Sequence, residues 1–386
     1  MSKEEKKVIV KSDWQNNFML IGEAKVNDFT FKINERSTKS NWVYNSLNLG
    51  VDCGEKFGTV YCEFMGGYSE EKENVIYAHG KNEDDSDDYK TQIIVAWEDR
   101  FNDNILEQIG DNCFITVGLE KTTEGKTFYK KFLSEYDAIE YVKEHLEDGM
   151  VVNVKGNLKY SEYNDATQVR KIITSIALSK AEKENYNAEF TQSILIDKDS
   201  ASLKDIDKDK SVMYVNAKVL DYMKEYNGIE VKGQYPFKKQ FEYELDLADE
   251  VKCKKIYEKL FKVKKGVTQV TFKGNFVEGG ATVTTTYDDV PDDIKELVEL
   301  GIFTKEDAIA KCSSNGARER RMVLKAPHIK LVGDDKTPVL QVFEERYTEE
   351  DLILDYLYEN TDEEEVNKDD VNGSASTDDL DWLSML

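Results

Sequence analysis

One short string occurs twice in the chain, and this repeat constrains the fold more than any other feature. Val152-Asn-Val-Lys-Gly-Asn-Leu158 matches Val270-Thr-Phe-Lys-Gly-Asn-Phe276. Both copies alternate apolar and polar residues, which is typical of a half-buried β-strand. Gly156 and Gly274 fall on the apolar side of their strands, where a glycine often marks a bulge or a sharp bend. The repeat therefore predicts two related β-domains.

The segments around the two strings also correspond. An amphipathic helix is predicted before each string, at 134–147 and 247–263, and an aromatic strand before each helix, at 127–133 and 237–245. A strand with basic residues follows each string, at 169–178 and 320–331. Upstream, Ala24-Lys-Val-Asn-Asp28 matches Ala217-Lys-Val-Leu-Asp221. This alignment predicts a large β insertion at about 30–125 in the first copy and a helical insertion at about 288–314 in the second.

The order of predicted elements is three strands, a helix and two strands, which is the order of a five-stranded OB barrel. We therefore expect a mainly β chain with short helices, built as two tandem OB-type five-stranded barrels and a disordered acidic C-terminal tail. The expected first domain is 1–185 and the second is 190–345. Residues 346–386 are expected to hold a short helix, the tail and an apolar tip. The alternative is a coincidental recurrence of ordinary strands.

The sequence resembles the bacterial and phage single-stranded DNA-binding protein family. One feature that carries the resemblance is a helix followed by Asp-Gly and then Val-x-Val-x-Gly-x-Leu, over residues 141–158, and this pattern recurs less closely at 257–276. The others are the opening Leu20-Ile-Gly22 and the acidic C-terminus with its apolar end. It implies a tandem, phage-type version that protects single-stranded DNA in replication, recombination or repair, and it leaves homo-oligomers open. The end, Trp382-Leu-Ser-Met-Leu386, lacks the family's proline-phenylalanine ending.

The net charge of −25 opposes nucleic-acid binding, but the charge is unevenly distributed. Residues 349–386 hold fourteen acidic residues and one lysine, so more than half of the net charge lies in this segment. The rest of the chain is still acidic. A nucleic-acid path therefore requires a local basic groove, because the overall field repels phosphate.

Binding of a single strand without sequence preference needs aromatic platforms for bases and cations for phosphates. Trp42 and Tyr44 share a polar strand face with Ser46 and Asn48, and Tyr61 lies on a similar face. The alternative is that these rings pack beneath a loop or a partner subunit and that the lysines are simply solvated. The candidate nucleic-acid-binding residues are Trp42, Tyr44, Tyr61, Phe128, Tyr129, Lys130, Lys131, Lys155, Arg170, Lys171, Tyr235, Phe237, Lys238, Lys239, Lys273, Arg320 and Arg321.

The C-terminal segment is expected to bind protein partners. Residues 359–377 are acidic and polar and should be disordered. The chain then returns to apolar residues, and an apolar anchor among acids suits a basic, grooved surface on a replication or recombination protein. The alternative is a solubilising end with chance hydrophobes. The candidate partner-binding residues are Asp378, Asp379, Asp381, Trp382, Leu383 and Leu386.

Signals of catalysis are weak, so we expect no enzyme, no metal and no cofactor. Gly125-Lys126-Thr127 lacks the first glycine of a phosphate loop. His79, His145 and His328 are scattered, the five cysteines form no C-x-x-C pair, and the acid pairs at 84–88 lie in a polar loop. No apolar run suits a membrane span or a signal peptide, which predicts a cytoplasmic protein, in the host cytoplasm if phage-encoded. Two rival classes remain, an accessory subunit of a replication enzyme and a structural or assembly module that binds only protein.

Overall fold

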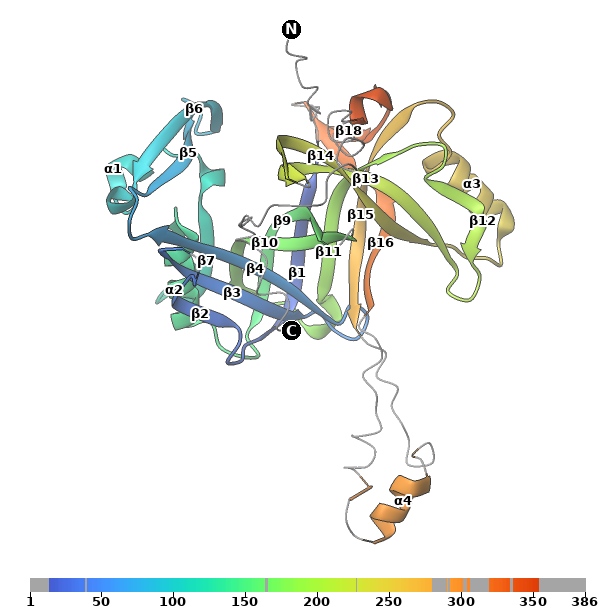
Figure 1. Cartoon of the computed structure of the whole chain (residues 1–386), viewed down its shortest axis with the longest axis horizontal. Coiled ribbons are helices and arrows are strands. Elements are labelled where there is room, and N and C mark those ends of the chain that lie inside the picture. Colours follow the sequence, from blue (N-terminus) through green and yellow to red (C-terminus); the bar gives the residue numbers. More distant parts are fainter. Residues whose placement is uncertain are drawn as a thin grey trace, which may run out of the picture.

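The backbone hydrogen bonds of the computed structural model close two five-stranded barrels, which lie side by side (Figure 1). The structure describes residues 14–38, 40–163, 166–226, 228–279, 290, 292–300, 304–305, 319–333 and 336–353. Within these residues no helix is both long enough and apolar enough to span a bilayer.

The first barrel is formed by β1 (Asn16–Lys25), β3 (Trp42–Asp52), β4 (Thr59–Ser69), β10 (Ala166–Leu178) and β9 (Val151–Tyr163), which pairs back with β1. Neighbouring strands are antiparallel except β4 and β10. Helix α2 (Glu135–His145) precedes β9 and buries its predicted apolar side, including Ala138 and Val142. Ser134 is its N-cap, because the Ser134 hydroxyl accepts a hydrogen bond from the Tyr136 amide.

The second barrel repeats this connectivity. Its strands are β11 (Asn187–Ile196), β13 (Val212–Tyr226), β14 (Ile229–Glu244), β16 (Glu319–Pro327) and β15 (Val267–Gly279), which returns to β11. The parallel pair is again between the third and fifth strands, β14 and β16. Helix α3 (Glu250–Leu260) again lies between the third and fourth strands. The predicted fold class of two OB-type barrels is confirmed, whereas the predicted tail lies outside the described residues.

The repeated string supplies the same bend to both barrels. A Cβ at Gly156 would lie 1.9 Å from the Ile172 carbonyl oxygen, and one at Gly274 would lie 2.5 Å from that of Val323. The register between the fourth and fifth strands shifts beside each glycine. The glycines therefore let the fifth strand approach closely where the barrel wall bends, as the sequence predicted.

The two barrels share one continuous sheet, because their first strands pair antiparallel. Phe18 on β1 lies opposite Phe190 on β11, Gly156 lies beside Phe18, and Gly274 lies beside Phe190. These four residues form a row across β9, β1, β11 and β15, with an approximate two-fold relation through its centre. One apolar core cluster continues through both barrels.

Three parts of the sequence alignment were wrong. Lys25 ends β1, the first strand of its barrel, whereas Lys218 lies in β13, the second strand, so the match between the segments that contain them has no structural meaning. Strands β3 and β4, which fall within the predicted insertion at about 30–125, are barrel strands. The aromatic strand before α2, now β8 (Thr127–Phe132), pairs with β7 (Ile115–Lys121) at the edge of the sheet instead of closing the barrel.

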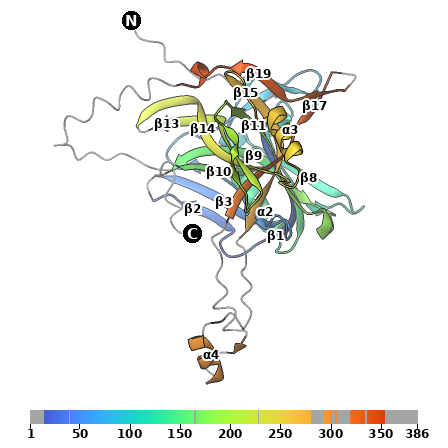
Figure 2. The same ribbon diagram turned by 90° about the vertical axis from the view of Figure 1, so that its right-hand side faces the viewer.

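The remaining strands and helices are short and lie outside the two barrels. In the first half they are β2 (Phe31–Arg36), the hairpin of β5 (Val75–Lys81) and β6 (Asp87–Ala96), η1 (Trp97–Asp99), α1 (Asp103–Leu106) and η2 (Asp111–Cys113). In the second half they are η3 (Lys183–Asn185), β12 (Ala201–Asp207), α4 (Asp292–Glu299), β17 (Ile329–Val332), β18 (Thr337–Leu340), β19 (Val342–Tyr347) and η5 (Glu350–Leu352). Helix α4, in the predicted helical insertion, stands apart from both barrels in Figures 1 and 2.

Candidate nucleic-acid interface

The second and third strands of an OB barrel form the face on which oligonucleotides commonly bind. In the first barrel these strands are β3 and β4, and in the second they are β13 and β14. Strand alternation turns the core residues of each pair inward, which leaves the polar and aromatic positions facing outward. The two faces differ in chemistry.

The β3–β4 face is aromatic. Trp42 and Tyr61 are 36% and 38% exposed, and the ring of Tyr44 lies 6.4 Å from that of Trp42 at 74°. Each of the two exposed rings lies against a glycine. A Cβ at Gly67 would meet the Trp42 indole nitrogen at 1.9 Å, and one at Gly50 would meet the Tyr61 ring at 3.3 Å. The missing side chains let both rings lie across the neighbouring strand while staying partly open to solvent.

Charge on the β3–β4 face is balanced. Glu63 projects from β4 and accepts a hydrogen bond from Arg170 Nε at 2.5 Å, so this predicted phosphate contact already has a carboxylate partner. Partial burial, and then the charge of Glu35, raise the pKa of Tyr44. The phenol therefore stays neutral and adds no charge to the face.

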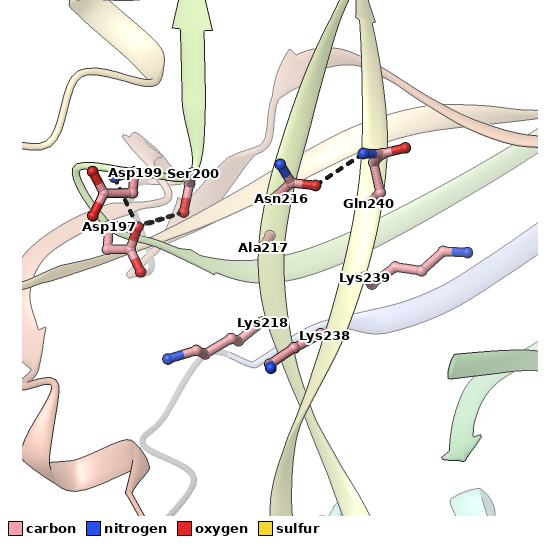
Figure 3. Close-up of a pocket in the computed structure, with 9 residues that line it drawn as sticks. All are labelled: Asp197, Asp199, Ser200, Asn216, Ala217, Lys218, Lys238, Lys239 and Gln240. Atoms are coloured by element: carbon pink, nitrogen blue, oxygen red, sulfur yellow. Dashed lines mark hydrogen bonds between the residues drawn. The ribbon is translucent and has the colours of Figure 1, made fainter. Parts of the chain in front are cut away.

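The β13–β14 face is cationic, and Figure 3 shows its side chains. Lys218 on β13 lies directly opposite Lys238 on β14, and Asn216 lies opposite Gln240, whose amide donates to it at 2.9 Å. In the described part of the chain, neither lysine has a carboxylate within ion-pair distance. Two like charges directly across a ladder destabilise a sheet, and an anion bound between them would remove that cost.

These side chains line an open cavity of about 470 Å³. Asp197, Asp199 and Ser200 form its opposite wall, so the cavity has a positive floor and a negative wall. Ser200 donates to Asp197 at 3.0 Å, which ties that carboxylate to its own turn and away from the two lysines. The cationic side of the cavity is therefore its strand side. Lys218 was not among the predicted contacts, although its polar position between buried Ala217 and Val219 could have identified it.

Two lysines of the predicted set point into the junction between the barrels. Lys171 is 8% exposed, and its ammonium lies 2.5 Å from a carboxylate oxygen of Glu278, which is also buried. Its prediction as a phosphate contact was wrong, because strand alternation turns Lys171 to the same buried side of β10 as the core residue Ile173. Lys239 is half-buried and points away from Lys218 (Figure 3). Burial, and then the charge of Lys171, lower the pKa of Lys239.

Tyr235 and Phe237 are not stacking platforms. They are 7% and 1% exposed and pack edge-to-face at 4.9 Å inside the second barrel. The alternation of β14 places the odd-numbered residues of this segment inward and Lys238 and Gln240 outward. The sequence prediction identified the strand but did not separate its two faces.

The remaining candidates lie on other surfaces. On β8, Phe128 and Tyr129 are 47% and 57% exposed, but the Lys130 ammonium lies 4.6 Å over the Tyr141 ring and Lys131 pairs with Asp111 at 3.1 Å. The other four are cations on the barrel walls. Lys155 on β9, Lys273 on β15 and Arg320 on β16 are exposed, and Arg321 pairs with Glu242 at 2.5 Å.

The predicted set therefore does not form one groove. The strongest concentration of its chemistry is on the two equivalent strand pairs, β3–β4 and β13–β14. The tail candidates, residues 378–386, lie outside the described residues. Where the chain is described, no group of three or more His, Cys, Asp or Glu side chains is arranged to hold a metal ion.

Comparison with known proteins gives one family and several structural neighbours. No curated protein matches the chain. A deletion mutant of the single-stranded DNA-binding protein from Thermus aquaticus is similar at 11% identity with a TM-score of 0.30, over 69% of this chain and 89% of that one. The wild-type Thermus aquaticus protein is similar at 11% identity with a TM-score of 0.29, over 69% of this chain and 86% of that one. The YorF family model matches residues 84–288, which is more than half of the chain, and the protein therefore belongs to the YorF family.

Proposed function

We propose that the protein binds single-stranded DNA with little sequence preference. The observation that carries this proposal is the chemistry of two equivalent surfaces. The second and third strands of one barrel present exposed aromatic rings, and those of the other present two opposed lysines that have no carboxylate partner among the described residues. Bases stack on Trp42, Tyr44 and Tyr61, and phosphates bind at Lys218 and Lys238.

The energetics of such a site suit a strand of any sequence. Stacking of a base on an aromatic side chain contributes roughly 1–3 kcal/mol and is open to every base, since each has a π-face. The lysine pair supplies local cations on a chain whose net charge of −25 otherwise repels phosphate. Contacts to the faces of bases and to the phosphate backbone include no hydrogen bonds to base edges, so we expect sequence preference to be weak.

The wider role follows from the same proposal. The protein covers single strands during replication, recombination or repair, acts without catalysis, and recruits partner proteins through its acidic C-terminal segment. The sequence resemblance to single-stranded DNA-binding proteins supports this role and its phage-type setting, and the proposed location is the cytoplasm.

Fluorescence titration with oligo(dT) at several salt concentrations tests the proposal. We expect quenching of tryptophan fluorescence by stacked bases, and an affinity that falls as salt rises because bound phosphates release counterions. Oligo(rU) and duplex DNA of equal length serve as comparison ligands. Equal affinity for the duplex would contradict base stacking. No binding to any nucleic acid would favour the protein-only module, and metal-dependent cleavage of the strand would favour the enzyme subunit.

A further inference from the structure

A cysteine, a histidine and an aspartate meet beside the β5–β6 hairpin, away from both proposed binding faces. Cys113 Sγ lies 3.1 Å from His79 Nδ1, and His79 Nε2 lies 2.8 Å from Asp87 Oδ1. A nucleophile within reach of a base, with that base oriented by a third group, is the arrangement that activates thiols and hydroxyls. No sequence pattern pointed to this cluster, since its residues are 8 and 34 positions apart.

The three side chains of this cluster come from three neighbouring elements and are closely packed. His79 comes from β5, Asp87 from β6, and Cys113 from the end of η2. A Cβ at Gly110 would lie 2.3 Å from the Asp87 carboxylate and 2.6 Å from the imidazole, so these two groups occupy the space beside that glycine. The Tyr89 ring covers the imidazole at 4.5 Å. Asp87, expected in a solvated loop, has a side chain only 15% exposed.

The hydrogen bonds around Asp87 favour its charged form. Asp87 Oδ1 accepts from the Asn112 amide at 3.1 Å, and its Oδ2 accepts from the Asn112 side chain at 2.7 Å. The Asn112 amide and then His79 lower the pKa of Asp87, which keeps the carboxylate charged. A charged Asp87 draws the imidazole proton to Nε2 and leaves Nδ1 to accept a proton from the thiol.

The sulfur also has a donor for its charged form. The backbone N–H of His79 donates to Cys113 Sγ at 3.3 Å. Nearby Asp111 does not oppose a thiolate strongly, because Lys81 and Lys131 each lie 3.1 Å from its carboxylate. The hydroxyl of Tyr89 accepts from the Asn112 side chain at 2.9 Å and adds no charge. Asp87 Oδ1 contacts Nε2, whereas Cys113 Sγ lies nearer Nδ1, at 3.1 Å, than Nε2, at 3.7 Å. In the described part of the chain these side chains are not arranged to hold a metal ion.

We propose that Cys113 is a nucleophilic thiol that undergoes exchange with low-molecular-weight disulfides. The thiol proton moves to His79 Nδ1, and the sulfur forms a bond to one sulfur of the disulfide. The S–S bond of that disulfide breaks, and its second sulfur leaves as a thiolate that takes the proton from His79. The product is a mixed disulfide on Cys113 and one free small thiol. This site is independent of the proposed DNA binding.

Other cysteines of the chain provide an internal comparison. Cys53 and Cys62 lie in the barrel core, and burial raises the pKa of Cys53 to about 12 and raises that of Cys62 as well. Burial also raises the pKa of Cys253. Within the described residues these three thiols have no histidine beside them, and they should react slowly in the folded protein.

The test uses the full chain with an aromatic disulfide, 5,5′-dithiobis(2-nitrobenzoate), and peptide mass spectrometry without reductant to identify the labelled cysteine. We expect Cys113 to be labelled at least about tenfold faster than Cys53 or Cys62 at pH 7. His79→Gln, which keeps a polar side chain of similar size, should slow Cys113 at least about tenfold, and Asp87→Asn should slow it less. Circular dichroism and the melting temperature report whether each variant is folded.

The wild-type protein alone supplies a second measurement. A free thiol has a pKa of about 8.5. Below that pH, the fraction present as thiolate rises nearly tenfold for each unit by which the pH is raised. We expect the labelling rate of Cys113 to change by less than about threefold between pH 6.5 and pH 8.5. Equal Cys113 rates in the wild type and His79→Gln, or a wild-type rate that rises as steeply with pH as that of a free thiol, would overturn the proposal.

Discussion

Lys171 on β10 and Glu278 on β15 form a buried ion pair, 2.5 Å apart, that joins the first barrel to the second. The Lys171 ammonium also lies 4.7 Å over the Phe276 ring. Both charges are removed from water, so each depends on the other for its stabilisation. The apolar contact between the barrels therefore contains a buried ion pair, and buried Asp221 of β13 adds a second polar contact, since it accepts from the Tyr160 amide of β9 at 2.8 Å.

The first prediction concerns this pair. Lys171→Met should lower the free energy of unfolding by about 3 kcal/mol, because it leaves the Glu278 carboxylate buried without its cation. Urea unfolding followed by circular dichroism measures the change. The double variant Lys171→Met with Glu278→Gln should recover most of the loss. A single variant as stable as the wild type would show that the charge of Glu278 is solvated.

The second prediction tests the aromatic face. Trp42→Ala combined with Tyr44→Ala should weaken oligo(dT) binding at least tenfold, because removing a ring on which a base stacks costs roughly 1–3 kcal/mol. Fluorescence anisotropy of a labelled oligonucleotide reports the affinity. Tyr77→Ala, which removes a 66% exposed ring from the β5–β6 hairpin, is the matched control and should bind normally. Unchanged affinity in the double variant would exclude β3–β4 as the binding path.

The third prediction tests the opposed lysines. Lys218→Ala with Lys238→Ala should weaken DNA binding and make it less dependent on salt. The slope of log K against log salt should become shallower by roughly 0.7 for each phosphate that is no longer neutralised. Removing the repulsion between them should leave the protein at least as stable. Lys254→Ala with Lys255→Ala, two exposed lysines on α3, changes the net charge equally and should keep the slope. If both double variants behave alike, the pair makes no direct contact with phosphate.

The fourth prediction tests the acidic C-terminal segment as a competitor for the cationic face. Deleting residues 359–386 should tighten DNA binding, and more so at low salt, because the charge attraction is screened over about 8 Å at physiological ionic strength. Trp382→Ala with Leu386→Ala keeps the charge and should leave DNA affinity unchanged while reducing capture of replication partners. Weaker DNA binding after the deletion would mean that the segment belongs to the binding surface.

The fifth prediction concerns the repeated string. Gly156→Ala and Gly274→Ala should each destabilise the fold by about 1–3 kcal/mol, since the added methyl group overlaps a backbone carbonyl in both barrels. Gly279→Ala is the control, because among the described residues no atom lies within 4 Å of the position its methyl group would take. Thermal unfolding compares the three variants. Equal stability of all three would mean that the barrel wall relaxes without cost.

The sequence was most informative where one residue has a local structural consequence. The glycine in each Val-x-Val/Phe-Lys-Gly-Asn string marks a bend that only a residue without a side chain permits, and the two strings located both barrels. The alternation around Trp42 and Tyr44 likewise separated their exposed side from the buried side of Val43 and Leu47. Such features depend on neighbours along the chain.

Pairing between distant strands was much harder to predict. Lys171 and Arg170 are adjacent and equally basic, yet one lies in the junction between barrels and the other pairs with Glu63. Lys218 gains its significance only from Lys238, twenty positions away and directly across the sheet. Cross-strand register sets these contacts, and it depends on the turn and on bulges such as the register shift between Met223 and Glu225 on β13.

The row of Gly156, Phe18, Phe190 and Gly274 also has a consequence for concentration. Two separate barrels joined through their first strands would come apart on dilution, and the relative position of their outer faces would be lost with them. In this chain that joint is intramolecular, so a strand that contacts both faces meets the same geometry at nanomolar as at millimolar protein. Pairing β1 with β11 also occupies, on both strands, backbone groups that an open sheet edge would offer to other chains.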